Sequence, residues 1–249
     1  GIYALRGKLL NVRNSKTLSI TQNKVISDII KSLGVGYGID YTKDSNYDKL
    51  RYGKIMIITD QDADGIHISG LIQNMFHNLF PTLLDRKESF VTSMQTPIVR
   101  VTQHPRDLLF FDENEYKRYV QTYKLKFPGK KINKKYYKGL GTSSSKDIKE
   151  TFGMKIINYK KDENTKFNMN KVFHKNHSDA RKEWLGNYNP QDISVKWDGN
   201  NTEIKDLSIS TFLDKEMIKF SINDCKRSIP NMVDGLKESQ RKTLYACFL

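Results

Sequence analysis

One short segment constrains the fold of this 249-residue chain more than any other. Lys54–Thr59 is a continuous apolar run with β-branched residues, which predicts a strand buried on both faces, as in a parallel sheet. The acidic stretch Asp60–Gly65 follows at once, and apolar residues at helical spacing then continue until Pro81. The segment therefore predicts a strand, an acidic turn and a helix. In open α/β sheets, ligands bind at this carboxyl end of the strands.

The acidic turn carries three aspartates, Asp60, Asp62 and Asp64. Carboxylates so close in sequence repel one another, and their ionised state is unfavourable without a cation. Mg²⁺ suits them because it is a hard ion that often takes one or two carboxylates together with waters and phosphate oxygens. At a strand end, the two-residue period can send Asp60 and Asp62 to the same side.

Four interpretations of this turn stay open from the residues alone. An EF-hand calcium loop shares the pattern D-x-D-x-D-G, but its twelfth position would be Leu71 instead of glutamate, and the preceding segment is strand-like. The others are a phosphotransferase with Asp60 as nucleophile, a magnesium site for phosphodiester chemistry in nucleic acid, and a solvated acidic turn. The pattern favours the magnesium site and argues against the EF-hand.

The charge balance points to a polyanionic partner. The chain has 42 Lys and Arg against 28 Asp and Glu, a formal charge of +14, which favours nucleic acid first and an anionic membrane second. No run approaches the ~20 apolar residues of a membrane span. Cys225 and Cys247 are the only cysteines, so neither a disulfide framework nor a four-cysteine zinc site is available.

Other elements are predicted less sharply. A helix is expected within Ile20–Leu33 and is followed by Gly34 as its stop. Later in the chain, strands are expected in Phe90–Thr102 and Leu108–Asp112, and a basic loop at Lys124–Lys135. Helices are expected to start in Glu115–Val120, to follow a cap formed by Ser144 and Asp147, and to occupy Ala180–Leu185. Two further helices are expected near Thr211–Ile222 and Lys237–Phe248. The basic loop is either solvated or faces DNA. Residues 155–205 are polar and give no clear pattern.

Six segments resemble the type II DNA topoisomerases in their order along the chain. They are GIYALRGKLLNV, KIMIITDQDADGIHI, TPIVRV, YYKGLGTS, DARKEWL and RSIPNMVDGLKESQRKTLY. The acidic motif alone is shared with primases, type IA topoisomerases and some nucleases through the TOPRIM fold, whereas the other segments are far more specific. Because the tail runs from the TOPRIM region toward a winged helix on one polypeptide, the chain resembles the fused eukaryotic or large-virus type.

The resemblance implies a fold and a domain order. It implies an α/β fold in which a TOPRIM (Rossmann-like) parallel-sheet domain precedes a helical lead-in to a winged-helix domain. We expect the TOPRIM domain at residues 1–155, an extension or linker at 156–205, and the start of the winged-helix DNA-binding region at 206–249.

The resemblance also assigns roles to individual residues. Asp60 and Asp62 match the family's magnesium ligands, and Asp64 matches a third, supporting aspartate. Lys8 and Asn11 match positions that contact DNA near the cut, and Arg241 matches a catalytic arginine at the scissile phosphate. From the residues alone, Lys8 and Arg241 would be solvated surface cations and Asn11 a turn residue.

The parent enzyme implied by the resemblance is a homodimer that breaks one DNA duplex transiently and passes another through it. The implied cofactor is Mg²⁺, with Mn²⁺ or Ca²⁺ as substitutes, and ATP belongs only to a separate ATPase domain. The partners are double-stranded DNA and a second copy, without a membrane. The expected compartment is the nucleus for a cellular protein, or a cytoplasmic replication site for a viral one.

Several parts of the family pattern are missing from the chain. The glutamate motif EGDSA, expected upstream of RGK, and the attacking tyrosine, expected beyond Leu249, are absent, so we expect the chain alone to be inactive. Ala4, Ala63 and Glu238-Ser239 also depart from the usual residues. Two rival functions stay open: another TOPRIM enzyme, such as a primase or nuclease, and a non-catalytic basic DNA-binding module.

Overall fold

The computed structural model describes residues 1–103, 105–190, 192, 195–197 and 202–249. Its centre is a four-stranded sheet in the order β1-β2-β6-β7. The strands are β1 (Ile55–Ile58), β2 (Val91–Met94), β6 (Lys155–Lys160) and β7 (Glu203–Ser208). The β1–β2 and β6–β7 pairs are parallel, whereas β2 and β6 are antiparallel. The predicted α/β class and its mostly parallel sheet are therefore confirmed.

The largest core holds the helix that follows the acidic turn. This helix, α4 (Ala63–Leu79), buries Met75 and Phe76 completely, and the Phe76 ring lies 5.5 Å from that of Phe90, just before β2. Burying large apolar side chains is the main favourable contribution to such packing. The start of α4 is thereby fixed beside the carboxyl end of β1.

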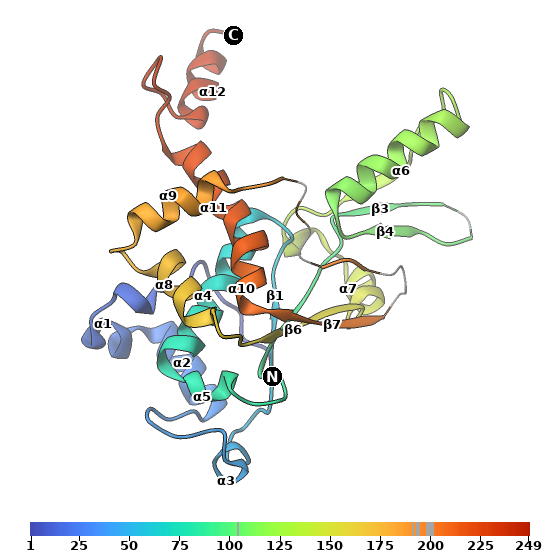
Figure 1. Cartoon of the computed structure of the whole chain (residues 1–249). Helices are drawn as coiled ribbons and strands as arrows, with labels where there is room; N and C mark the ends of the chain where they lie inside the picture. The colour runs from blue at the N-terminus through green and yellow to red at the C-terminus, as the bar shows by residue number, and fades with distance from the viewer. Residues whose placement is uncertain (104, 191, 193–194, 198–201) are drawn as a thin grey trace.

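Most of the helices lie around the main sheet, whereas the last helix projects away from it (Figure 1). They are α1 (Thr17–Gln22), α2 (Lys24–Leu33), α3 (Asp44–Tyr47), α5 (Pro81–Leu84), α7 (Ser145–Thr151), α8 (Thr165–Phe173), α9 (Ser178–Gly186), α10 (Ile209–Phe212), α11 (Ile218–Ser228) and α12 (Glu238–Cys247). A π-helical turn at Leu213–Met217 joins α10 to α11. Among the described residues, no helix is both long and apolar enough to cross a membrane.

A smaller unit projects from this body. Its antiparallel sheet has the order β4-β3-β5, with β3 (Val99–Val101), β4 (Leu108–Phe110) and β5 (Lys134–Tyr136), and it carries the long helix α6 (Glu113–Lys126). The unit has a separate core, made of Val99, Val101, Phe110 and Tyr116. Figure 1 shows α6 standing away from the main sheet.

Most local signals are confirmed. Gly34 ends α2 in the left-handed conformation at φ 74°, and Ser144 with Asp147 forms the predicted capping box at the start of α7. The expected helix within residues 20–33 is divided by Asn23, whose side chain caps the second piece, α2.

Two expectations about local structure are wrong. β1 is an edge strand and is not buried on both faces: Ile57 is buried on one face, whereas Met56 and Ile58 on the other face are 37% and 38% exposed. The basic stretch at 124–135 is not all loop, because α6 continues to Lys126 and β5 starts at Lys134. Residues 155–205 give no clear sequence pattern apart from the short helix at Ala180–Leu185, which α9 (Ser178–Gly186) confirms; the described part of this stretch also holds β6, α8 and the start of β7.

A buried ion pair joins the last two strands of the main sheet. Lys155 lies opposite Glu203 in the register of β6 and β7, with Nζ 2.7 Å from Oε1 and side chains only 6% and 7% exposed. Removing one member of such a pair leaves an uncompensated buried charge, whereas apolar residues can replace both at little cost.

We predict that Glu203→Leu lowers the free energy of unfolding by about 3–5 kcal/mol. Urea denaturation measures the change. The double variant Lys155→Met/Glu203→Leu should recover most of the loss, and Glu163→Leu, at an exposed position, is the matched control. Equal stability of Glu203→Leu and the unaltered chain would contradict the prediction.

Candidate functional site

The acidic turn lies where sequence reasoning places it, between β1 and α4. Asp60 follows the end of β1, Asp62 is the N-cap of α4, and Asp64 belongs to the first helical turn. Asp62 Oδ1 accepts a 2.8 Å hydrogen bond from the Gly65 amide, which satisfies one of the unpaired donors of the helix start. One oxygen of Asp62 is thus used to begin the helix.

Gly65 allows this sharp transition from strand to helix. A Cβ atom at this position would lie 2.1 Å from the Asp60 carbonyl oxygen and 3.1 Å from Cβ of Thr59. No side chain fits at that separation, so the glycine of the D-x-D-x-D-G pattern is a steric requirement of the turn. The same close approach keeps the Asp60 backbone against the amino end of α4.

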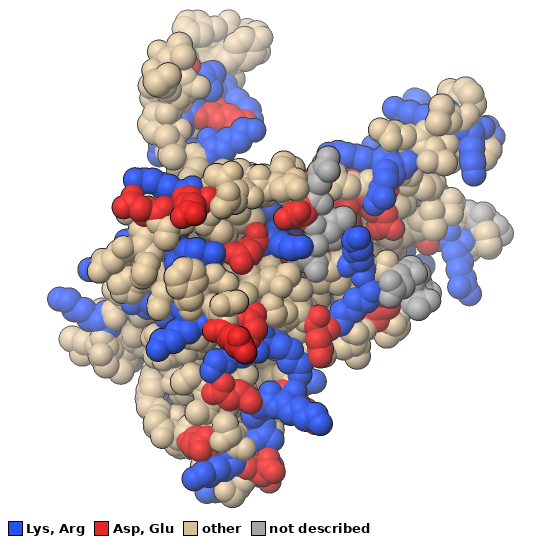
Figure 2. Space-filling model, viewed as in Figure 1, with Lys and Arg blue, Asp and Glu red and all other residues tan. Residues whose placement is uncertain are grey.

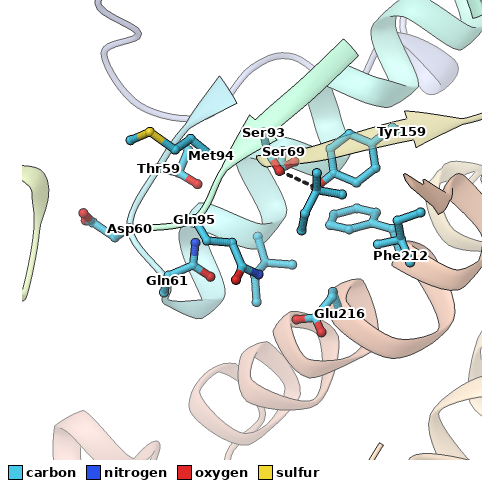
Figure 3. A pocket seen from close by; sticks show the side chains of 13 residues that line it. Thr59, Asp60, Gln61, Ser69, Ser93, Met94, Gln95, Tyr159, Phe212 and Glu216 are labelled. Atoms are coloured by element: carbon cyan, nitrogen blue, oxygen red, sulfur yellow. Dashed lines mark hydrogen bonds between the residues drawn. The ribbon is translucent and has the colours of Figure 1, made fainter. Parts of the chain in front are cut away.

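Asp60 is the aspartate whose charge is least compensated. Partial burial, and next the negative charge of Asp62, raise the pKa of the Asp60 carboxyl above its usual value. Asp60 lies at the rim of a small cavity of about 40 Å³, and its carboxylate points away from the inner wall formed by Tyr159 and Phe212 (Figure 3). A cation beside Asp60 would stabilise the ionised carboxylate and so offset the effects of burial and of the Asp62 charge.

Asp64 has the opposite environment. Arg227, on α11, binds it with two parallel hydrogen bonds of 2.8 and 3.1 Å, and Lys8 Nζ lies 2.9 Å from Oδ1. The hydrogen bonds from Arg227, and next from Lys8, hold the pKa of the Asp64 carboxyl well below its usual range. Asp64 therefore ties together three segments that are distant in sequence.

The Phe220 ring contacts the Lys8 cation and the His67 ring. Lys8 Nζ lies 4.8 Å from the centre of the Phe220 ring, and His67 stacks on the ring at 3.8 Å. Burial, and next the charge of Lys8, lower the pKa of His67 to about 4, so its ring is neutral at pH 7. His67 Nδ1 has no hydrogen-bond partner among the described residues.

The three aspartates therefore do not act as one cluster. Among the residues that the structure describes, no group of three Asp, Glu, His or Cys side chains is arranged to hold a metal ion. Asp60 and Asp62 nevertheless provide the hard oxygen donors that Mg²⁺ prefers, and Mg²⁺ sites commonly need only one or two protein carboxylates. Asp64 is committed to Arg227 and Lys8, so the donor set fits a cation at Asp60 and Asp62.

Asn11 is a structural residue in this chain. Its Oδ1 accepts hydrogen bonds from the Arg13 amide and Asn74 Nδ2, and its Nδ2 donates to the Phe173 carbonyl at 2.9 Å. These bonds fix the N-terminal segment against α4 and α8. One amide hydrogen of Asn11 is left after these contacts.

Arg241 lies on α12, which extends beyond α11 and away from the main sheet (Figure 1). Its guanidinium makes two hydrogen bonds to Asp234, at 2.7 and 2.8 Å, and a weaker one to the Leu236 carbonyl. These partners belong to the turn that precedes α12. The structure brings Lys8 and Asp64 together, but it does not show Arg241 in contact with the acidic turn.

The glycine-rich loop after β5 reaches the acidic turn from the other side. A Cβ atom at Gly139 would lie 3.9 Å from Asp60 Oδ2. The base of this loop is fixed by Tyr137, whose hydroxyl donates to Asp147 at 2.8 Å and accepts from Arg100 Nε at 2.9 Å. Burial, and next the Asp147 hydrogen bond, raise the pKa of Tyr137 to about 12.

Sequence reasoning missed two residues of this arrangement, Arg227 and Arg100. Both stand in segments that carry the family resemblance, but their partners are far away: Arg227 and Asp64 are 163 positions apart. Spacing alone gives no signal for such a contact. Arg100 forms ion pairs with Asp107, Asp147 and Glu150, which join β3 to α7.

Comparisons with known proteins agree with this geometry. The family described as "Toprim domain" matches residues 1–94, and "C-terminal associated domain of TOPRIM" matches residues 94–225. DNA topoisomerase 2 of Invertebrate iridescent virus 6 is 41% identical over 255 residues, covering 98% of this chain and 22% of the relative. DNA topoisomerase 2-alpha of Homo sapiens is 41% identical over 266 residues, covering 100% and 16%.

A solved structure shows the same fold. It is the crystal structure of the Plasmodium falciparum topoisomerase II DNA-binding, cleavage and re-ligation domain, with a TM-score of 0.81 and 38% identity over 98% of this chain and 32% of that one. The chain thus spans less than a quarter of the length of the two curated relatives and about a third of the solved domain.

We predict that Asp64→Asn lowers the free energy of unfolding by about 1 kcal/mol at pH 7, because partly exposed ion pairs contribute little individually. Since folding lowers the pKa of Asp64, its contribution is complete above about pH 4 and is lost as the pH falls further. The difference between the two proteins should therefore shrink in acid.

Thermal or urea unfolding between pH 7 and pH 3 measures this difference. Asp179→Asn is the matched control, because Asp179 pairs only with Lys182 on its own helix and is 90% exposed, so no measurable change is expected. A loss that is the same at pH 3 and pH 7 would argue against the ion pairs as its cause.

Proposed function

Because this chain belongs to the type II DNA topoisomerase family, as its TOPRIM region and the segment that follows, we propose that it is the magnesium-binding part of a DNA cleavage core. The observation that carries the proposal is the half-buried Asp60 beside Asp62 at the end of β1, where the raised pKa marks a place for a cation. In the whole enzyme, this part would serve ATP-dependent passage of one duplex through a transient break in another.

In this proposal, Asp60 and Asp62 hold Mg²⁺ through their carboxylate oxygens. The ion, when bound, supplies positive charge to the phosphate and the leaving 3′ oxygen. Asp64 does not need to bind the metal. Held by Arg227 and Lys8, it fixes the first turn of α4 and so the direction of the Asp62 side chain.

The cations around the turn are proposed to position DNA. The Lys8 ammonium has three donor hydrogens and its side chain is 40% exposed, so it can contact a phosphate while it keeps Asp64. Asn11 has one amide hydrogen to offer. Arg241 would exchange Asp234 for the scissile phosphate, where a guanidinium stabilises the developing negative charge.

The proposed cellular setting follows the same reasoning. The enzyme would be a homodimer acting on double-stranded DNA, in the nucleus if cellular or at a cytoplasmic replication site if viral. A primase or nuclease with the same acidic motif would leave free DNA ends. A topoisomerase of this family leaves protein attached to 5′ ends, which denaturing gels of trapped cleavage products distinguish.

We predict that Asp60→Asn or Asp62→Asn in the full-length enzyme reduces Mg²⁺-dependent DNA cleavage by at least about 100-fold, since each removes a ligand charge. Asparagine keeps the N-cap at position 62, so helix α4 should stay intact. Asp179→Asn, at an exposed position on α9, is the control and should cleave normally. Normal cleavage by both ligand variants would refute the magnesium assignment.

Metal binding by the 249-residue chain tests the same assignment without catalysis. Mn²⁺ titration followed by electron paramagnetic resonance should show weaker binding in both variants. Because the pKa of Asp60 is raised, protons should displace the metal at a higher pH than an ordinary aspartate would allow. Binding that does not change between pH 7 and pH 4 would oppose a role for Asp60.

We further predict that the purified 249-residue chain does not relax supercoiled plasmid, because it holds neither the family's glutamate motif nor its attacking tyrosine. Agarose gel electrophoresis of plasmid incubated with the chain and Mg²⁺ measures this directly. Relaxation by the chain alone would overturn the proposed division of the active site.

A further inference from the structure

The excess positive charge of the chain is concentrated in one stretch. Residues 116–146 contain ten Lys or Arg and no Asp or Glu, which leaves 32 Lys and Arg against 28 Asp and Glu in the rest of the chain. The rest is therefore nearly balanced. Most of this basic stretch belongs to the projecting unit of β3, β4, α6 and β5, residues 99–136, which we call the basic arm.

The cations at the tip of the arm are available for a ligand. Lys124, Lys126, Lys130 and Lys131 are exposed, and no carboxylate among the described residues forms an ion pair with any of them. By contrast, Lys135 near the base is paired with Asp147. Figure 2 shows blue side chains along the projecting arm, with acidic side chains only near its base.

The arm is built as a rigid support. Along α6, Tyr119, Tyr123 and Phe127 form a series of ring contacts 5.9 and 5.1 Å apart, and Phe110 of β4 packs on Tyr119 at 5.0 Å. Lys130 Nζ lies 5.2 Å from the Phe127 ring. Ordered aromatic contacts hold the basic tip in place, which lowers the entropy cost of binding there.

The arm leads directly to the acidic turn. Strand β5 continues through Tyr137 into the glycine-rich loop, where Gly139 faces Asp60. Arg100, on the central strand of the arm, anchors it to α7 through Asp147 and Glu150. A polyanion held near Asp60 would therefore lie next to the base of the arm. In Figure 1, α6 and α12 project from the same side of the body.

From these observations we infer that the basic arm is a second docking surface for duplex DNA, which binds phosphates flanking the cleaved bond. The inference rests on the proposed cleavage function and adds a surface to it. The contacts are to phosphates and not to bases, so they increase affinity without sequence preference. Duplex DNA is the occupant because the tip offers four exposed lysines without an acidic ion-pair partner among the described residues, which complements the dense negative charge of a duplex.

The test replaces Lys124, Lys126, Lys130 and Lys131 by alanine in the 249-residue chain and measures binding to a ~40-bp duplex at several salt concentrations. The slope of log K against log salt should fall by about 2–4, and affinity near 0.1 M salt should drop about 10–100-fold. The control replaces Lys16, Lys31, Lys43 and Lys49, which are exposed on the α1–α3 side, and should change the slope by less than about 1.

A photo-crosslinking amino acid gives an independent measurement. Leu125 is 83% exposed at the tip of the arm, and Leu18 is 65% exposed on α1. Crosslinks to the duplex are expected from position 125 and not from position 18. Equal salt slopes for the arm and control variants, or no crosslink at position 125, would overturn the inference.

The same experiments separate this inference from the proposed function. If the unaltered chain shows no salt-dependent DNA binding, the proposed function fails. If it binds DNA and the arm variant binds equally well, only the arm inference fails. Sedimentation with phosphatidylserine vesicles tests an anionic membrane as the alternative occupant. If the four lysines are needed for binding to vesicles but not for binding to DNA, the inference is also overturned.

Discussion

Three carboxylates at the end of one strand are the feature around which this site is arranged, and the repulsion acts between Asp60 and Asp62. The chain gives each carboxylate a different environment. Asp62 accepts a hydrogen bond from the Gly65 amide at the start of α4, and Asp64 is bound by Arg227 and Lys8. In Asp60, burial and the charge of Asp62 make the ionised carboxylate less favourable, which raises its pKa. The proposed cation therefore belongs at Asp60 and not at Asp64, which Arg227 and Lys8 already neutralise.

The ion pairs that neutralise the charge of Asp64 connect segments that are distant in the sequence. Lys8 comes from the N-terminal segment, Arg227 from the end of α11, and both bind the same carboxylate at the start of α4. Arg227 also bonds Asp224 on its own helix, so the direction of α11 is linked to the acidic turn. Helix α12, which carries Arg241, follows α11 after a short turn. The bidentate pair between Arg227 and Asp64 therefore connects the acidic turn to the helix that precedes α12.

Sequence reasoning succeeded where a signal was local. The strand, turn and helix around Asp60, the left-handed stop at Gly34 and the capping box at Ser144 each depend on neighbours a few residues apart, and each is confirmed. It failed where the outcome depended on the other side of the fold. The apolar run of β1 does not reveal that this strand lies at an edge, with Met56 partly exposed. No pattern near Asp64 indicates that Arg227 will neutralise it.

The polar stretch at 155–205 shows why composition alone misleads. In β6, the exposed fractions alternate along the strand, and the buried positions include Lys155, which reads as a surface residue until Glu203 is placed opposite it. The opposite holds for the basic arm, where a run that reads as solvated loop is partly ordered helix and strand. Salt screens charges beyond roughly 8 Å at physiological ionic strength, so only cations held close to a ligand contribute strongly. For the proposed contact with flanking phosphates, the ordering of the arm therefore matters as well as its number of lysines.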